Sequence, residues 1–158
     1  MRQSKIILVF SFGLYSLFIV LGNVMDYNSN FQFVKHVLSM DTVFPENSLM
    51  WRSINNTSLH HVFYIIIICA EAIITYFCFA GGLDLLKNLK TVSEEFNNAK
   101  KKSIIGLTAA FVLWFVGFIA IGGEWFLMWQ SETWNGIEAA FRISVISLLL
   151  IIFLSRAD

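Results

Sequence analysis

Four long apolar segments, at residues 6–24, 59–83, 104–126 and 137–154, limit the folds open to this chain. Each has close to the roughly 20 residues that a helix needs to cross the hydrocarbon core of a bilayer. With 57% hydrophobic and only 14% charged residues, the chain has too little charge to cover a soluble domain. We therefore predict an all-α integral membrane four-helix bundle that forms a single domain over residues 1–158.

The first apolar segment also resembles a secretory signal, because Arg2 and Lys5 precede it. Its apolar run is longer than the roughly 7–15 residues of a signal sequence, and no small-residue cleavage motif follows. We expect this segment to be retained as a membrane anchor.

The distribution of basic residues predicts the orientation of the bundle. Eight of the 11 lysines and arginines fall on one side of the predicted membrane: Arg2, Lys5, Lys87, Lys90, Lys100, Lys101, Lys102 and Arg156. The positive-inside rule then places both termini and the loop at 84–103 in the cytoplasm. The loop at 25–58 and the stretch at 122–136 lie on the outer side.

The outer loop is too long for a simple connector, and we expect it to be structured. Apolar residues at Phe31, Val34, Val37 and Leu38 follow a helical period and predict a short amphipathic helix lying on the membrane. The tryptophans near the outer end of the third span suit an interfacial aromatic belt better than a ligand-stacking cage.

A polar stripe runs along the second span. His60, Tyr64, Glu71 and Thr75 share one helical face, with Glu71 close to the middle of the membrane. Such a stripe must face protein or trapped water, because polar groups in hydrocarbon are costly. The four residues are a candidate polar pathway.

The third and fourth spans also carry charge. In the third, a stripe of small residues leads to Glu124, which we expect to point into the bundle. In the fourth, Glu138 and Arg142 form an i,i+4 pair, and a line of small residues occupies nearly the opposite face. Both faces of this helix therefore look committed to protein contacts, which predicts a second subunit or another membrane protein as a partner.

These charges predict a buried ionic network in which Arg142 pairs with Glu124, and Glu138 or Glu71 completes the set. The favoured interpretation is that the network fixes the register of the helices. The alternative is that Glu71 handles a proton or a ligand.

No catalytic motif is present, so we assign no catalytic residue, and cofactors are left open. His36, His60 and His61 lie in the outer half, but their spacing is not that of a metal site. The formal net charge of +0 gives no reason to expect a nucleic acid as a partner.

The stretches MDYNSNFQFVKHVLSMDTVFP at 25–45 and GGEWFLMWQSETWNG at 122–136 are distinctive. With them the whole chain resembles a family of small bacterial integral membrane proteins known as domain of unknown function 2165. The resemblance implies a four-helix protein of the bacterial inner membrane, without a known activity. It also implies that any binding site lies on the outer side, among Asp26, His36, Asp41, Arg52, Glu124, Trp129, Gln130, Trp134 and Asn135.

Three functions are compatible with these features. The favoured one is a non-enzymatic structural or accessory subunit, which assembles with itself or with a larger inner-membrane complex. The second is an oligomeric transporter, channel or proton-coupled protein that uses the polar stripe. The third is a site for a metal, haem or quinone at the outer interface.

Overall fold

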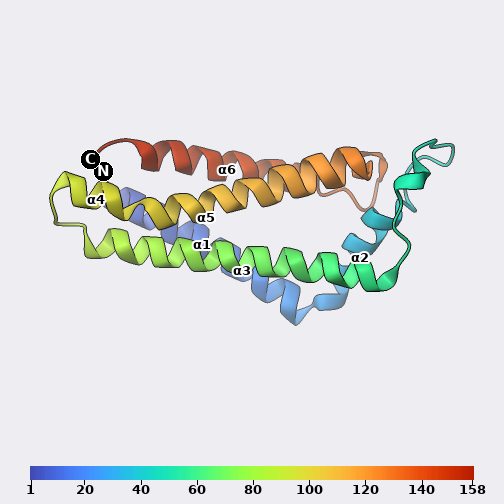
Figure 1. Cartoon of the computed structure of the whole chain (residues 1–158), viewed down its shortest axis with the longest axis horizontal. Helices are drawn as coiled ribbons and strands as arrows, with labels where there is room; N and C mark the ends of the chain where they lie inside the picture. Colours follow the sequence, from blue (N-terminus) through green and yellow to red (C-terminus); the bar gives the residue numbers. More distant parts are fainter.

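The computed structural model describes residues 1–158 and consists of helices joined by loops, without a β-strand (Figure 1). Four long helices run side by side along the molecule, and each is long and apolar enough to cross a membrane. Both chain termini lie at one end, which we call the terminal end. The short helices and loops at the opposite end form what we call the cap. The predicted all-α membrane fold is confirmed.

The long helices extend beyond the apolar segments that predict them. They are α1 at Arg2–Met25, α3 at Thr57–Lys87, α5 at Lys101–Phe111 with its continuation η2 at Val112–Trp125, and α6 at Ile137–Ser155. The extra turns contain polar residues, which a helix tolerates once it leaves hydrocarbon. A side-chain cap fixes the start of α3, where the Asn56 oxygen accepts from the backbone N–H groups of Ser58 and Leu59.

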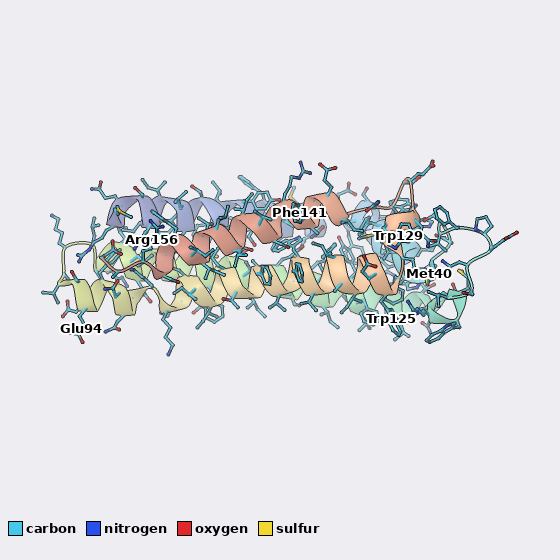
Figure 2. All side chains as sticks on the ribbon, turned by 90° about the horizontal axis from the view of Figure 1, so that it is seen from above. Met40, Glu94, Trp125, Trp129, Phe141 and Arg156 are labelled. Carbon is cyan, nitrogen blue, oxygen red and sulfur yellow. The ribbon has the colours of Figure 1, made fainter.

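The cap is built from short helices: α2 at Tyr27–Ser39, η1 at Met50–Arg52 and η3 at Met128–Gln130. Figure 2 shows Met40, Trp125 and Trp129 at this end of the molecule, and Glu94 and Arg156 at the other. Helix α4, at Ser93–Ala99, lies at the terminal end beside the chain termini.

The amphipathic helix predicted in the outer loop is α2, but it does not lie free on a membrane surface. Its apolar residues Phe31, Val34 and Leu38 are buried in one cluster with Tyr64 of α3 and Phe126. The apolar face of α2 therefore covers the end of the bundle, because protein side chains are available there to bury it.

Close helix contacts in the bundle depend on residues without a side chain. A Cβ atom placed on Gly81 of α3 would lie 2.4 Å from the backbone nitrogen of Ser103 on α5. Only glycine allows α3 and α5 to approach so closely at this point.

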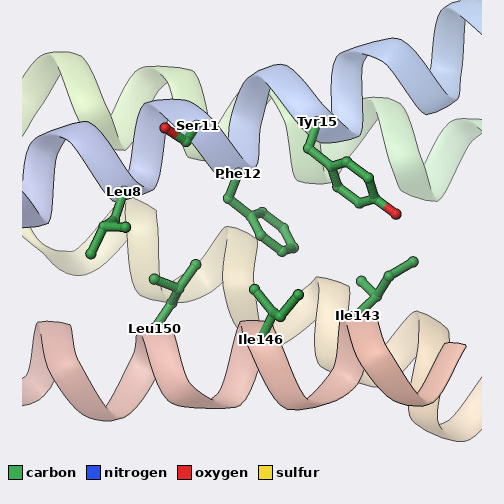
Figure 3. A pocket seen from close by; sticks show the side chains of 7 residues that line it. All are labelled: Leu8, Ser11, Phe12, Tyr15, Ile143, Ile146 and Leu150. Atoms are coloured by element: carbon green, nitrogen blue, oxygen red, sulfur yellow. The ribbon is translucent and has the colours of Figure 1, made fainter. Parts of the chain in front are cut away.

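In contrast, α1 and α6 diverge along part of their length. They leave a groove of about 230 Å³ lined mainly by apolar side chains, among them Leu8, Phe12 and Ile146 (Figure 3). One side of α6 is therefore not covered by the rest of the chain.

Charged side chains join three segments at the terminal end. Asp158 forms ion pairs with Lys5 of α1 and with Lys100, where the Nζ to Oδ2 distance is 2.6 Å. Both lysines also donate to the backbone oxygen of Arg156. Burial by itself would raise the pKa of Asp158, but the hydrogen bonds and positive charges of Lys100 and Lys5 outweigh it and lower that pKa.

The third spanning helix changes its winding at Val112. From there to Trp125 the segment η2 is π-helical, and Phe126 donates its N–H to the oxygen of Ile121, five residues earlier. Each residue of a π-turn advances around the axis by a smaller angle than in an α-helix. A side-chain stripe extrapolated along a regular α-helix therefore rotates away from its expected direction in this segment.

Candidate functional site

A cluster of buried polar side chains joins α1 to α3 in the interior of the bundle. Asn23 donates from Nδ2 to Oε2 of Glu71 over 2.6 Å, and the Tyr64 hydroxyl donates to the backbone oxygen of Asn23 over 3.1 Å. Ser16 and Thr75 continue the cluster, with 2.9 Å between their hydroxyl oxygens, and both hydroxyls lie within hydrogen-bonding distance of the Glu71 backbone oxygen. All five residues are buried.

Two of the five residues of this cluster, Asn23 and Ser16, were missed in the sequence. Asn23 and Ser16 lie seven residues apart on α1, a spacing that puts both on the same helical face. That shared face is the signal from which the sequence could have predicted them. Asn23 is the hydrogen-bond partner of Tyr64 and Glu71 on α3, and Ser16 is the partner of Thr75.

The Glu71 side chain borders a cavity of about 250 Å³. Asn23, Asn30 and Tyr64 supply the other polar groups of its wall, and aromatic and aliphatic side chains from α2, η2 and α6 complete it. A second cavity, also of about 250 Å³, adjoins the first and shares Phe33 and Phe118 with it. The carboxyl group thus lies at the boundary between a hydrogen-bonded cluster and an apolar space.

His60 is also buried, but it does not belong to the hydrogen-bonded cluster. Its Nε2 donates to the backbone oxygen of Ile54 over 2.7 Å, which ties the start of α3 to the preceding loop. The structure therefore separates His60 from Glu71, although both lie on the predicted face of α3.

Below Thr75, towards the terminal end, no polar path continues along this face. The next buried side chains of α3 in that direction are Cys78 and Leu85, each fully covered by the rest of the chain. The polar groups of α3 form a pocket that ends inside the bundle and does not connect its two ends.

The predicted network of Glu71, Glu124, Glu138 and Arg142 needs correction. Glu124, Glu138 and Arg142 lie on the surface of the chain, and none of the four residues takes part in an ion pair. The π-helical winding of η2 explains Glu124, because it turns this residue away from the bundle. On α6 the line of small residues Ala140, Ser144 and Ser147 faces inward, so the charged face points outward.

The outer-face candidates do not converge on one site. His36 pairs with Asp41 over 2.8 Å and stacks on Trp134 with 4.6 Å between ring centroids. Arg52 lies over the Trp125 ring at 4.4 Å and donates to its backbone oxygen.

The remaining outer-face candidates hold the cap together or are unpaired. The Gln130 side-chain oxygen accepts from the backbone N–H of Phe44 and from the Asn47 amide, which joins the two cap loops. Trp129 packs edge-on against Phe44, and Asn135 accepts from the N–H of Ile137 at the start of α6. Asp26 is on the surface at the junction of α1 and α2.

An aromatic stack lies above the Glu71 cluster, on the side of the cap. The rings of Phe31 and His61 are parallel with 4.0 Å between centroids, and Tyr27 stacks beside them. The Tyr27 hydroxyl is 2.8 Å from Nδ1 of His61. The rings of Tyr27 and Phe31 also lie against Tyr64, so the stack covers this end of the polar cluster.

No three histidine, cysteine, aspartate or glutamate side chains come together in a geometry that can hold a metal ion. The histidines are engaged with Ile54, Tyr27 and Asp41. The buried chemistry of the chain is concentrated in the Glu71 cluster and its cavity.

Comparison with known proteins agrees with this architecture. No curated protein and no solved structure matches the chain. A family model described as a predicted small integral membrane protein matches residues 1–156. The four apolar helices account for that description in physical terms. Because the match covers nearly every residue, the chain belongs to this family of small integral membrane proteins, domain of unknown function 2165.

Proposed function

We propose that this protein is a non-enzymatic membrane subunit that self-associates through α6. The observation that carries the proposal is Arg142, which lies on the surface of an apolar spanning helix without an ion-pair partner. A charge inside the hydrocarbon is costly unless a partner or the headgroup region compensates it.

The outward face of α6 is complementary to itself. Glu138 lies one helical turn before Arg142, and both side chains are exposed. In a parallel pair related by a two-fold axis, each patch meets a copy of itself, so that Glu138 of one copy can pair with Arg142 of the other. Phe141, Val145 and Leu149 are exposed on the same side and supply apolar contact.

The rest of the chain leaves this face free. The groove between α1 and α6 exposes Ile146, and the buried small residues of α6 are already used within the bundle. A second copy would cover the apolar side chains and pair the charges at the same time. We propose the bacterial inner membrane as the location, with the terminal end in the cytoplasm.

Disulfide cross-linking in native membranes tests this interface. With Cys69 replaced by serine, Val145→Cys on α6 should form a cross-linked dimer on mild oxidation. The matched control is Ile73→Cys, which lies exposed on α3 and should remain monomeric. Arg142→Glu should reduce dimer formation, and the added exchange Glu138→Arg should restore it, because the swap recreates the opposite charges.

Equal cross-linking at Val145→Cys and Ile73→Cys would contradict the proposal. So would a single-chain mass in lipid nanodiscs, which would mean that the Arg142 side chain simply extends to the headgroups. Cross-linking of Val145→Cys to a different protein, without a dimer, would replace self-association by assembly into a larger complex.

A further inference from the structure

The two adjoining cavities beside Glu71 have a polar end and an apolar end. The first has Asn23, Tyr64 and Glu71 in its wall together with the rings of Phe33, Trp114 and Phe118. The second extends towards the cap between α2, α3 and η2, and its lining offers no charged group. An amphipathic small molecule has the matching division of polar and apolar parts.

Glu71 is the only ionisable acid or base with its side chain in the wall of the first cavity, apart from the Tyr64 phenol. No lysine, arginine or histidine faces the cavity from α1, α2, α3, η2 or α6. The Asn23 amide hydrogen-bonds to Oε2, and no hydrogen bond reaches Oε1. Because Glu71 is only 2% exposed, it is a buried acceptor with one oxygen available to a ligand.

The aromatic rings favour the same kind of ligand as the carboxyl group. Tyr64 and Trp114 are almost completely buried and line the cavity beside Glu71, and Phe33 and Phe118 add two further rings. The faces of aromatic rings attract cations, and ammonium groups above all. An anionic ligand would meet the carboxyl group without any cation to balance it.

We propose that this cavity binds a lipophilic organic cation, with its ammonium head at Glu71 and its hydrocarbon tail in the apolar cavity. The Glu71 Oε1 atom and the ring faces hold the head, and Asn23 keeps the carboxyl group in position. Phe33 and Phe118 line both cavities, so they contact the ligand where the head joins the tail. The site does not depend on self-association through α6.

Equilibrium binding of radiolabelled octyltrimethylammonium to the full chain in nanodiscs tests the proposal, with empty nanodiscs as the background. We expect saturable binding of one molecule per chain, displaced by unlabelled ligand but not by octanol or octyl sulfate. Glu71→Gln should lower the affinity by about tenfold or more, because the charge is lost. The glutamine oxygen can still accept from Asn23.

Glu124→Gln is the matched control, since it removes a carboxylate from the surface of the chain and should leave the affinity unchanged. If Glu71→Gln fails to fold, Phe118→Leu decides the question. Loss of this half-buried ring should reduce ammonium affinity about two- to fivefold. Displacement of the wild-type ligand by octanol at equal concentration, unchanged affinity in both site variants, or absence of saturable binding would each overturn the proposal.

Discussion

At the scale of single residues, two buried carboxyl groups at different depths of the bundle have different kinds of partner. Glu71, in the middle of α3, has an amide partner and aromatic neighbours but no cation. Asp158, at the terminal end, has two lysines. The lysines can reach their partner because the end of the bundle lies close to water, where long basic side chains are tolerated.

The Asp158 cluster predicts a loss of stability in Asp158→Asn. The substitution leaves Lys5 and Lys100 buried without a counter-charge, and we expect the free energy of unfolding to fall by about 1–3 kcal/mol. Detergent-induced unfolding followed by tryptophan fluorescence measures the change. Asp84→Asn is the control, because the pair of Asp84 with Lys102 is partly exposed to solvent and its loss should have little effect.

The lowered pKa of Asp158 gives this contribution a pH dependence. The contribution is fully present above the ordinary aspartate pKa of about 3.9 and is lost as the pH falls through the lower folded value. In an acid titration, the free energies of unfolding of the wild type and of Asp158→Asn should therefore converge as the pH falls below about 4. A stability difference that persists unchanged into stronger acid would contradict the assigned pKa direction.

At the scale of helices, packing depends on which face of each helix carries the small residues that allow close approach. Small residues in α5, such as Gly106 and Ala110, are buried as their spacing predicts. Beyond Val112 the same periodicity fails, and Ala120 and Glu124 reach the surface. The sequence pattern of small residues does not reveal the change to π-turns, so the direction of the last turns could not be read from it.

The contact of α3 with α5 predicts a strong effect of Gly81→Ala. The added Cβ would meet the backbone of Ser103, which cannot rotate away as a flexible side chain can. We expect a loss of about 1–3 kcal/mol in the free energy of unfolding. Gly22→Ala on α1 is the control, because its Cβ meets nothing within 4 Å and alanine favours helix. Equal stability of the two variants would show that α3 and α5 do not pack at Gly81.

At the scale of the whole molecule, the two ends differ in composition. The terminal end holds Arg2, Lys5 and Lys100, each engaged with backbone oxygens or Asp158. The cap end holds four of the five tryptophans, Trp51, Trp125, Trp129 and Trp134, with Trp125 and Trp129 about half exposed. The positive-inside rule associates the basic end with the cytoplasm, and the tryptophans of the cap suit a membrane–water interface.

This polarity predicts the orientation of the chain. In a background without Cys69, a cysteine introduced as Ser48→Cys in the cap should react with a membrane-impermeant maleimide in intact cells. Glu94, in α4 at the opposite end, is also exposed, and Glu94→Cys should react only after the membrane is opened. The reverse pattern of labelling would place the cap in the cytoplasm and contradict the orientation that we propose.

The sequence by itself determined the number of spanning helices, their positions and the side of α3 that carries Tyr64, Glu71 and Thr75. These follow from hydrophobic length and from helical spacing, which are local properties of the chain. Only the tertiary structure decided the partners of Glu71 and the outward direction of Arg142. The reason is physical: whether a polar group is satisfied depends on a neighbouring helix and on its rotation about its axis, and both are set by the packing of the whole bundle.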